Sequence, residues 1–148
     1  MTITEISRST FPKAEKLLRE NHIHLYVAYK KEATETGMAF AGIISNKLIL
    51  VMDMFKGFTR EEIECVIFHE IGHHVLKTED EKAADKFALC YVSREVYLST
   101  IAKTWMYAAE HHRKQGLPVK KYGEKYAHRN PLMQAYCAAH GINWNPGE

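Results

Sequence analysis

The stretch that decides the fold is Cys65–Asp85, CVIFHEIGHHVLKTEDEKAAD. Its segment HEIGH, residues 69–73, holds two histidines four residues apart, with a glutamate directly after the first. Each residue of an α-helix advances by about 100°, so His69 and His73 project about 40° apart, one turn above the other. Two imidazoles placed this way can share one tetrahedral metal ion. Glu70 points about 60° past His73, where it can take a proton from water at that ion. The spacing predicts a metal site with its own base.

The residues around this segment predict a mostly buried helix. Thr59 followed by Glu62 forms the pattern of a capping box at the start of a helix. Apolar residues then recur on one face at every fourth position: Ile63, Ile67, Ile71 and Val75. Gly72 costs such a helix about 1 kcal/mol relative to alanine, which indicates that another element packs closely against it.

A third ligand is expected downstream, because catalytic zinc sites use three protein ligands and leave one position open. The motif helix is expected to end near Lys77. Of the acids between Glu79 and Asp85, only Glu81 has another acid four residues later. One carboxylate of such a pair can bind metal while the other receives the N–H of a ligating imidazole. We therefore expect Glu81 to be the third ligand and Asp85 to accept the N–H of a ligating imidazole.

These motifs carry a resemblance to a known family. HEIGH, followed by ExxAD at residues 81–85 and by KFA at residues 86–88, resembles the gluzincin metallopeptidases. The variants most similar to it are the minigluzincins, the HtpX-like membrane peptidases and the peptidases of the ImmA/IrrE type. The approach FTREEIECVIF, residues 58–68, is also similar to the helix that carries their motif. The resemblance covers about Leu48–Tyr91.

The resemblance implies a zincin-like domain and a zinc metalloendopeptidase, a hydrolase that cleaves a peptide or protein substrate. Zinc would be held by His69, His73 and Glu81, with Asp85 orienting a ligand. Glu70 would act as general base on zinc-bound water. Some proteins of the ImmA/IrrE kind act on DNA-binding repressors, so a repressor is a candidate substrate or partner. The alternative is a metal-binding regulatory protein with little turnover, and a further one is a structural zinc module with a closed fourth position.

Other assignments of the acids near the third ligand remain open at this point. Thr78 with Glu81 also fits a capping box for the second helix, which would occupy the carboxylate of Glu81. Glu79 stands where metzincins carry their third ligand, but that family has a glycine at the position of Leu76. Asp80 has no second acid to support it. Glu81 remains the favoured ligand.

The whole chain has 148 residues, an apolar content of 46% and a net charge of +2. These values predict one domain over residues 1–148, with a metal-site core at 48–91 and a helical part at 94–148. The three cysteines include no CxxC pair, and the apolar, helical surroundings of Cys65 and Cys90 favour buried thiols, which fits a reducing compartment. No segment has a run of about 20 apolar residues, and the first residues do not resemble a signal peptide. We expect a soluble, cytoplasmic protein without a membrane partner.

The chain order predicts an α+β fold with a small antiparallel or mixed sheet packed on the motif helix. Strands are expected over 23–29, 37–45 and 47–53, and helices over 11–21, 94–115 and from Asn130 to Gly141. Ser9 or Thr10 is expected to cap the first helix and Ser93 the long one. Ser45-Asn46 suits a tight hairpin turn. The resemblance implies that an edge strand holds the substrate, and residues 37–45 are the candidate.

Two further features are weaker guides to function. Residues 113–129, RKQGLPVKKYGEKYAHR, combine bases with tyrosines, but they are more typical of a solvated loop than of a nucleic-acid site. Zinc peptidases commonly stabilise the oxyanion with a downstream His, Tyr or Arg. Five side chains are available for that role, and spacing selects none of them: Tyr91, Tyr97, Tyr107, His111 and His112.

Overall fold

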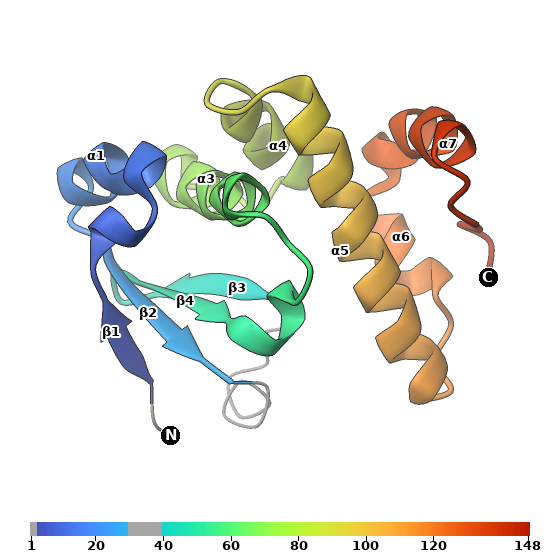
Figure 1. The fold of residues 1–148 in the computed structure, drawn as a ribbon, viewed down its shortest axis with the longest axis horizontal. Helices are drawn as coiled ribbons and strands as arrows, with labels where there is room; N and C mark the ends of the chain where they lie inside the picture. Colours follow the sequence, from blue (N-terminus) through green and yellow to red (C-terminus); the bar gives the residue numbers. More distant parts are fainter. Residues whose placement is uncertain (1–2, 30–39) are drawn as a thin grey trace. The chain divides into compact units, whose positions relative to one another are not determined.

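The computed structural model describes residues 3–29 and 40–148 and has an α+β fold (Figure 1). The α+β class predicted from the sequence is therefore confirmed. Contacts divide the chain into two compact units, Met1–Val92 and Ser93–Glu148. The boundary falls beside residue 94, where the helical C-terminal part was expected to begin. The organisation as a single domain stays a prediction.

The first unit contains a mixed sheet of four strands in the order β1-β2-β4-β3. The strands are β1 (Thr4–Ile6), β2 (His24–Ala28), β3 (Ala41–Ile44) and β4 (Lys47–Val51). β2 and β4 are parallel, and the other two pairs are antiparallel. Four consecutive residues of β4 are buried, which explains why its sequence is apolar on both faces. The prediction did not include β1, and residues 37–39 of the expected third strand lie outside the described residues.

The hairpin between β3 and β4 turns where the sequence predicts it. Ser45 and Asn46 have φ angles of 50° and 60°. Positive φ at both central residues is the geometry that lets a two-residue turn match the twist of the flanking strands. The hairpin fixes β3 at one edge of the sheet, with β4 as its hydrogen-bonded neighbour.

Helices α1 (Pro12–Glu20) and α3 (Arg60–Leu76) lie side by side over one face of the sheet (Figure 1). The predicted capping box of α3 is present in full, with both the Thr59 and Glu62 side chains bonded to backbone. Lys77 ends α3 with a left-handed backbone at φ 50°. Helix α4 (Glu81–Leu89) then packs along α3. Short 3-10 helices precede α1 and follow β4: η1 (Arg8–Thr10) and η2 (Met52–Phe55).

The cap of α1 differs from the prediction. Ser9 and Thr10 belong to the preceding 3-10 turn, and the N-cap Phe11 makes no side-chain bond to the helix. Instead, the backbone N–H of Lys13 donates to the carboxylate of Glu64 in α3, at 3.0 Å. Glu64 is only 1% exposed, so a buried carboxyl oxygen of one helix satisfies the first turn of another.

The second unit is helical. It consists of α5 (Arg94–Lys114), α6 (Lys120–Lys125), η3 (Ala127–Arg129) and α7 (Asn130–Ala139). Ser93 caps α5, as the sequence predicts, and Gly116 follows the helix at φ 69°. The expectation of a solvated loop over 113–129 was wrong in part, because α6 and η3 form within it. No helix of the described residues is long and apolar enough to cross a membrane.

We expect Glu64 to support α1 through its acceptor oxygen. Glu64→Met, which keeps the shape and removes the acceptor, should lower the free energy of unfolding by about 1–3 kcal/mol, because the Lys13 N–H loses its partner. Glu64→Gln keeps an acceptor oxygen and should cost less. Urea unfolding of the two variants beside the wild type measures the difference, and equal stability of the two would contradict this account.

Candidate metal centre

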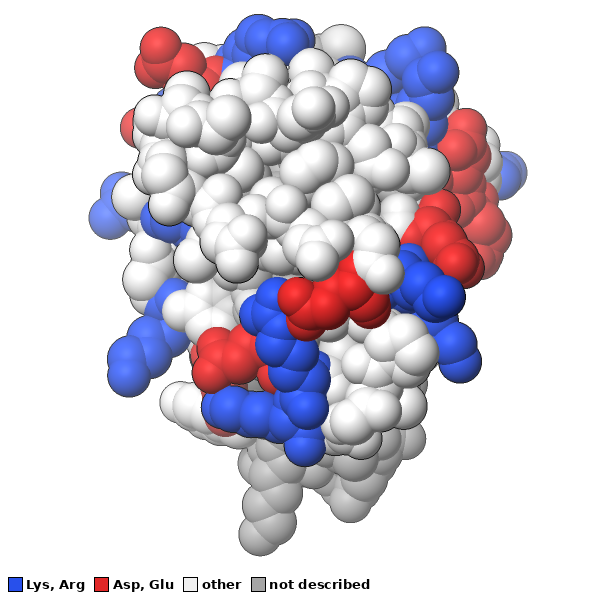
Figure 2. Space-filling view, turned by 90° about the vertical axis from the view of Figure 1, so that its right-hand side faces the viewer, with Lys and Arg blue, Asp and Glu red and all other residues white. Residues whose placement is uncertain are grey.

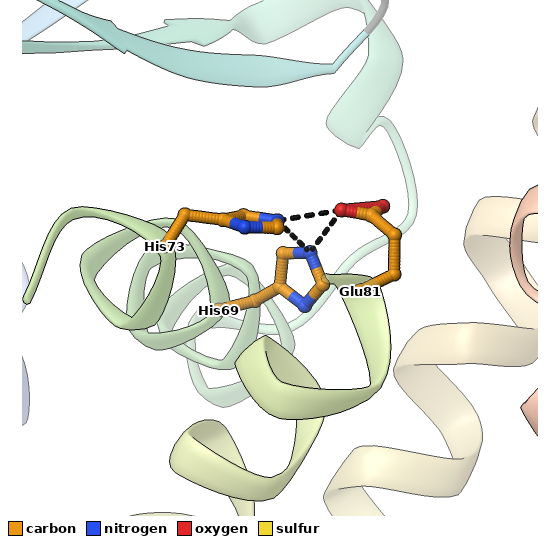
Figure 3. Close-up of side chains that lie close together, drawn as sticks. All are labelled: His69, His73 and Glu81. Carbon is orange, nitrogen blue, oxygen red and sulfur yellow. Dashed lines mark hydrogen bonds and ion pairs between the residues drawn. The ribbon is translucent and has the colours of Figure 1, made fainter. Parts of the chain in front are cut away.

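Three side chains from α3 and the start of α4 converge on one point (Figure 3). Nε2 of His73 lies 2.6 Å from Oε1 of Glu81 and 3.2 Å from Nε2 of His69. Nε2 of His69 lies 3.6 Å from the same carboxylate oxygen. Within the described part of the chain, this is the group of His, Cys, Asp or Glu side chains whose ligand atoms meet, all within 4.8 Å of one another.

The spacing of these atoms suits a zinc ion. Ligands held about 2.0–2.1 Å from a tetrahedral zinc lie about 3.3 Å from one another. The separations of 3.2 Å between the two imidazoles and 3.6 Å between His69 and Glu81 are close to that value. The separation of 2.6 Å between His73 and Glu81 is that of a hydrogen bond instead. A small movement of one side chain would therefore give all three edges of a zinc tetrahedron.

The other nitrogen of each ring shows why a cation is needed here. Nδ1 of His69 lies 2.7 Å from Oδ1 of Asp85, and Nδ1 of His73 lies 2.8 Å from the carbonyl oxygen of Thr78. A carboxylate and a carbonyl only accept, so each Nδ1 carries the hydrogen. In the neutral rings both Nε2 lone pairs then point toward the carboxylate of Glu81. These three acceptor atoms repel one another, and a cation between them removes the repulsion.

A proton meets this need when no metal is bound. Burial by itself would lower the pKa of His69, but hydrogen bonds with Asp85 and Glu81 and the nearby negative charges outweigh it and raise the pKa to about 9. The hydrogen bond with Glu81 also raises the pKa of His73 above its ordinary value. His69 of the metal-free site therefore holds a second proton at neutral pH, and a metal ion would displace it.

A short turn places Glu81 opposite the histidines. Thr78 accepts a hydrogen bond from the backbone N–H of Asp80 through its hydroxyl, at 3.0 Å. Asp80 then caps α4 by accepting from the N–H of Lys82, at 3.1 Å. The alternative in which Thr78 and Glu81 form the capping box is therefore wrong, because Asp80 is the N-cap. Glu81 is the first residue of α4, and its carboxylate turns inward.

Burial distinguishes the acids of this region. Glu81 and Asp85 are 8% and 3% exposed, whereas Glu79 and Asp80 lie on the surface. Glu79, the alternative ligand by position, is not part of the converging group. The structure thus brings together the three residues expected as ligands, with Asp85 on His69 as its expected helper. That they bind a metal stays a prediction.

The close approach of α3 and α4 depends on Gly72. A Cβ atom at this position would lie 2.9 Å from Cβ and 3.1 Å from Cγ of Phe87 in α4. Real Cβ atoms do not approach so closely, so any side chain at this position would separate the two helices. The expectation that another element packs closely against Gly72 is confirmed. Gly72 directly precedes His73 and lies about one turn after His69, so this contact keeps Glu81 within reach.

The predicted base and the candidate oxyanion residues lie outside the converging group. Glu70 is partly exposed on α3, and its charge is one of those that raise the pKa of His69. Tyr91 stacks on Phe68, with ring centroids 4.8 Å apart. It lies just beyond the end of α4, and its role at an oxyanion stays a prediction. The other four candidates for that role belong to α5 in the second unit.

Sequence reasoning missed one partner in the site, the backbone carbonyl of Thr78. Every residue has a main-chain carbonyl, so no residue type marks this acceptor in the sequence. The only signal was the short connection after Lys77. No protein-family model, curated protein or solved structure matched this chain. The class of the site is therefore defined by its geometry: two imidazoles and one carboxylate, partly to fully buried, that could hold a metal ion.

We expect Gly72→Ala to separate α3 from α4. The added methyl group should lower the free energy of unfolding by about 1–3 kcal/mol, although alanine is the better helix former. It should also weaken zinc binding, because Glu81 moves away from the histidines. The matched control is Gly123→Ala in α6, where a Cβ meets nothing within 4 Å and the protein should become slightly more stable. Urea unfolding and zinc titration test both, and unchanged zinc affinity in Gly72→Ala would contradict the account.

The stability of the metal-free protein should fall as the pH rises. His69 has a pKa of about 9 in the folded chain and an ordinary value of 6.5. The folded state binds this proton more tightly, so its contribution is complete below pH 6.5 and is lost as the pH passes through 9. Urea unfolding in the presence of a chelator measures the trend, which should be weaker in His69→Gln. Zinc affinity should change in the opposite direction, because protons compete for the ligands. A stability that rises over this range would exclude the proposed proton.

Proposed function

We propose that the chain is a zinc-dependent metallopeptidase of the gluzincin type, with a zincin-like fold in its first unit. The observation that carries the proposal is the convergence of three acceptors from His69, His73 and Glu81 on one point. A buried group of this kind is costly without a cation. Its donor set, two imidazoles and one carboxylate, is that of known catalytic zinc sites.

The number of ligands favours catalysis over a structural role. Structural zinc sites have four protein ligands, whereas catalytic sites have three and leave one position open. The group contains three such residues among those that the structure describes. This supports a peptidase in preference to a zinc module that only joins two helices.

The residues around the site have distinct roles in this proposal. Zinc bound there would act as a Lewis acid and bring the pKa of water to about 7. Glu70 would accept the proton and later donate it to the leaving amine. Asp85 and the carbonyl of Thr78 would hold the rings of His69 and His73 in the orientation that presents Nε2 to the ion, which also makes the imidazoles better donors of electron density.

The sheet supports a peptide as the substrate. β3 is an edge strand, hydrogen-bonded to β4 on one side and in contact with α3, which carries the histidines. An extended peptide can add to such an edge through main-chain hydrogen bonds, with side chains giving specificity. We propose that the substrate aligns along β3, as predicted for the strand that the sequence placed at 37–45.

The central test is Glu70→Gln. This variant should retain zinc and lose about 10²–10⁴-fold in kcat/KM, because general acid–base catalysis contributes on that scale. Glu81→Gln should instead lose zinc. The matched control is Glu79→Gln, which changes an exposed acid two residues away and should alter neither property.

Zinc content by metal analysis and cleavage of a fluorogenic peptide library measure these outcomes. Wild-type turnover in Glu70→Gln would exclude Glu70 as the base. Stoichiometric zinc with a partner bound but no turnover in the wild type would favour the regulatory alternative, with a DNA-binding repressor as its partner.

A further inference from the structure

Helix α7 and the segment that follows it contain no charged side chains. Asn130–Gly147 has 18 residues without a single Lys, Arg, Asp or Glu, in a chain in which 26% of the residues are charged. At that frequency about five charges would be expected. Figure 2, which views the side of the molecule where α7 lies, shows a broad area without charged side chains above a band where charges gather. Depletion of charge is typical of the core of a protein interface.

Helix α7 is apolar on its outer side as well as on its buried side. Met133 and Cys137 are 3% and 1% exposed and define the inner side, and α7 packs on α5. At about 100° per residue, Ala135 projects opposite the midpoint of these two residues. The positions around it are exposed or half-buried, with Gln134 as the polar exception: Pro131, Leu132, Gln134, Ala135, Ala138 and Ala139. A helix that is apolar all round is normally buried all round.

The lack of charge excludes several classes of partner for this outer side. Nucleic acids are bound through Lys and Arg side chains that neutralise phosphates. Helices that lie on membrane surfaces have Lys and Arg on their polar side. Complexes between different proteins use complementary charges to select the partner. A second copy of the same surface is uncharged by necessity, so it matches this side of α7.

A two-fold interface also explains why both signs of charge are missing. In such an interface the same patch lies on both subunits, so a side chain near the axis meets its own copy. A lysine there would face a lysine and a glutamate would face a glutamate, and like-charge contacts cost several kcal/mol. Two different proteins are free of this restriction, because a charge on one can be matched by its opposite on the other. The absence of both signs therefore favours a second copy over another protein.

The side chains of the outer side suit the packing of one helix on another. Ala135 and Ala139, one turn apart, are small enough for two helices to approach closely. Leu132 and Tyr136 border them on one side and are half-buried, with the Tyr136 ring packed on His140 at 4.1 Å between centroids. Helix α7 has 10 residues, which makes it about 15 Å long. Two such helices bury less than the roughly 1,600 Å² of a standard interface, so we expect a weak dimer.

We propose that the outer side of α7 is a dimer interface, at which α7 packs on α7 of a second copy of this chain about a two-fold axis close to Ala135. The interface is independent of the metal centre and of the peptidase proposal. Met133 and Cys137 hold α7 on its own unit, so dimer formation needs no rearrangement of the inner side.

Sedimentation equilibrium of the full chain at rising protein concentration tests this interface. The average mass of the wild type should rise from that of one chain toward that of two, equally at low and high salt, because no charges meet at the interface. Ala135→Lys and Ala135→Glu should each weaken association at least about tenfold, because each brings like charges together at the axis. An equimolar mixture of the two variants should associate again, because the lysine of one copy then meets the glutamate of the other.

The matched controls are Thr10→Lys and Thr10→Glu, which make the same changes at an exposed, uncharged position of the first unit and should leave association unchanged. Lysine and glutamate are good helix formers, so the Ala135 variants should keep the fold, which circular dichroism checks. If either does not fold, Ala138→Lys and Ala138→Glu repeat the test at a neighbouring exposed position. A wild-type mass of one chain at every concentration would overturn the proposal. Equal dimerisation of the charged variants would do the same, and so would a mixture that associates no better than its components.

Discussion

The structure of the first unit depends on one constraint, which is that two imidazole nitrogens and a carboxylate oxygen meet in a mostly buried place. This arrangement repels itself until a cation, either a proton or a metal ion, lies between the acceptors. Every neighbouring feature maintains it. Gly72 lets the two helices approach, the turn after Lys77 reverses the chain at once, and Asp85 holds the ring of His69 in one tautomer.

Helix α3 can carry this site because it is buried on more than one side. Most of its apolar residues are buried, although Val75 and Leu76 at its end are exposed, and three of its buried polar residues have partners on another element or at its own cap. Glu62 closes the capping box, Glu64 accepts from α1, and His69 pairs with Asp85 of α4. Helix α3, which supplies two of the three converging groups, is thus held by its own cap, by α1 and by α4. A change in the charge of this group would therefore alter the packing of α3 as well as the chemistry of the site.

Local patterns predicted what local geometry decides. The capping box at Thr59, the turn at Ser45-Asn46 and the pairing of Glu81 with Asp85 all follow from residues within five positions of one another. The structure agrees with them because nothing distant overrides them. The cap of α1 by Glu64 spans 51 residues, and no local pattern reports such a contact. The short strand β1 is stabilised by pairing with β2, which its own three residues do not reveal. The carbonyl that orients His73 belongs to the main chain, so no residue type in the sequence indicates it.

The two units present opposite deficits in hydrogen bonding. In the first, acceptor atoms converge so closely that a proton or a metal ion has to lie between them, and in the second, the N–H of Trp105 is buried without an acceptor. Elsewhere in the described residues, buried polar side chains such as Glu64 and Asp85 have partners. A folded chain gains nothing by burying a polar group unpaired, so such deficits indicate where a group from outside the chain completes the structure. At the histidines the missing group is a cation, and at the indole it is a hydrogen-bond acceptor.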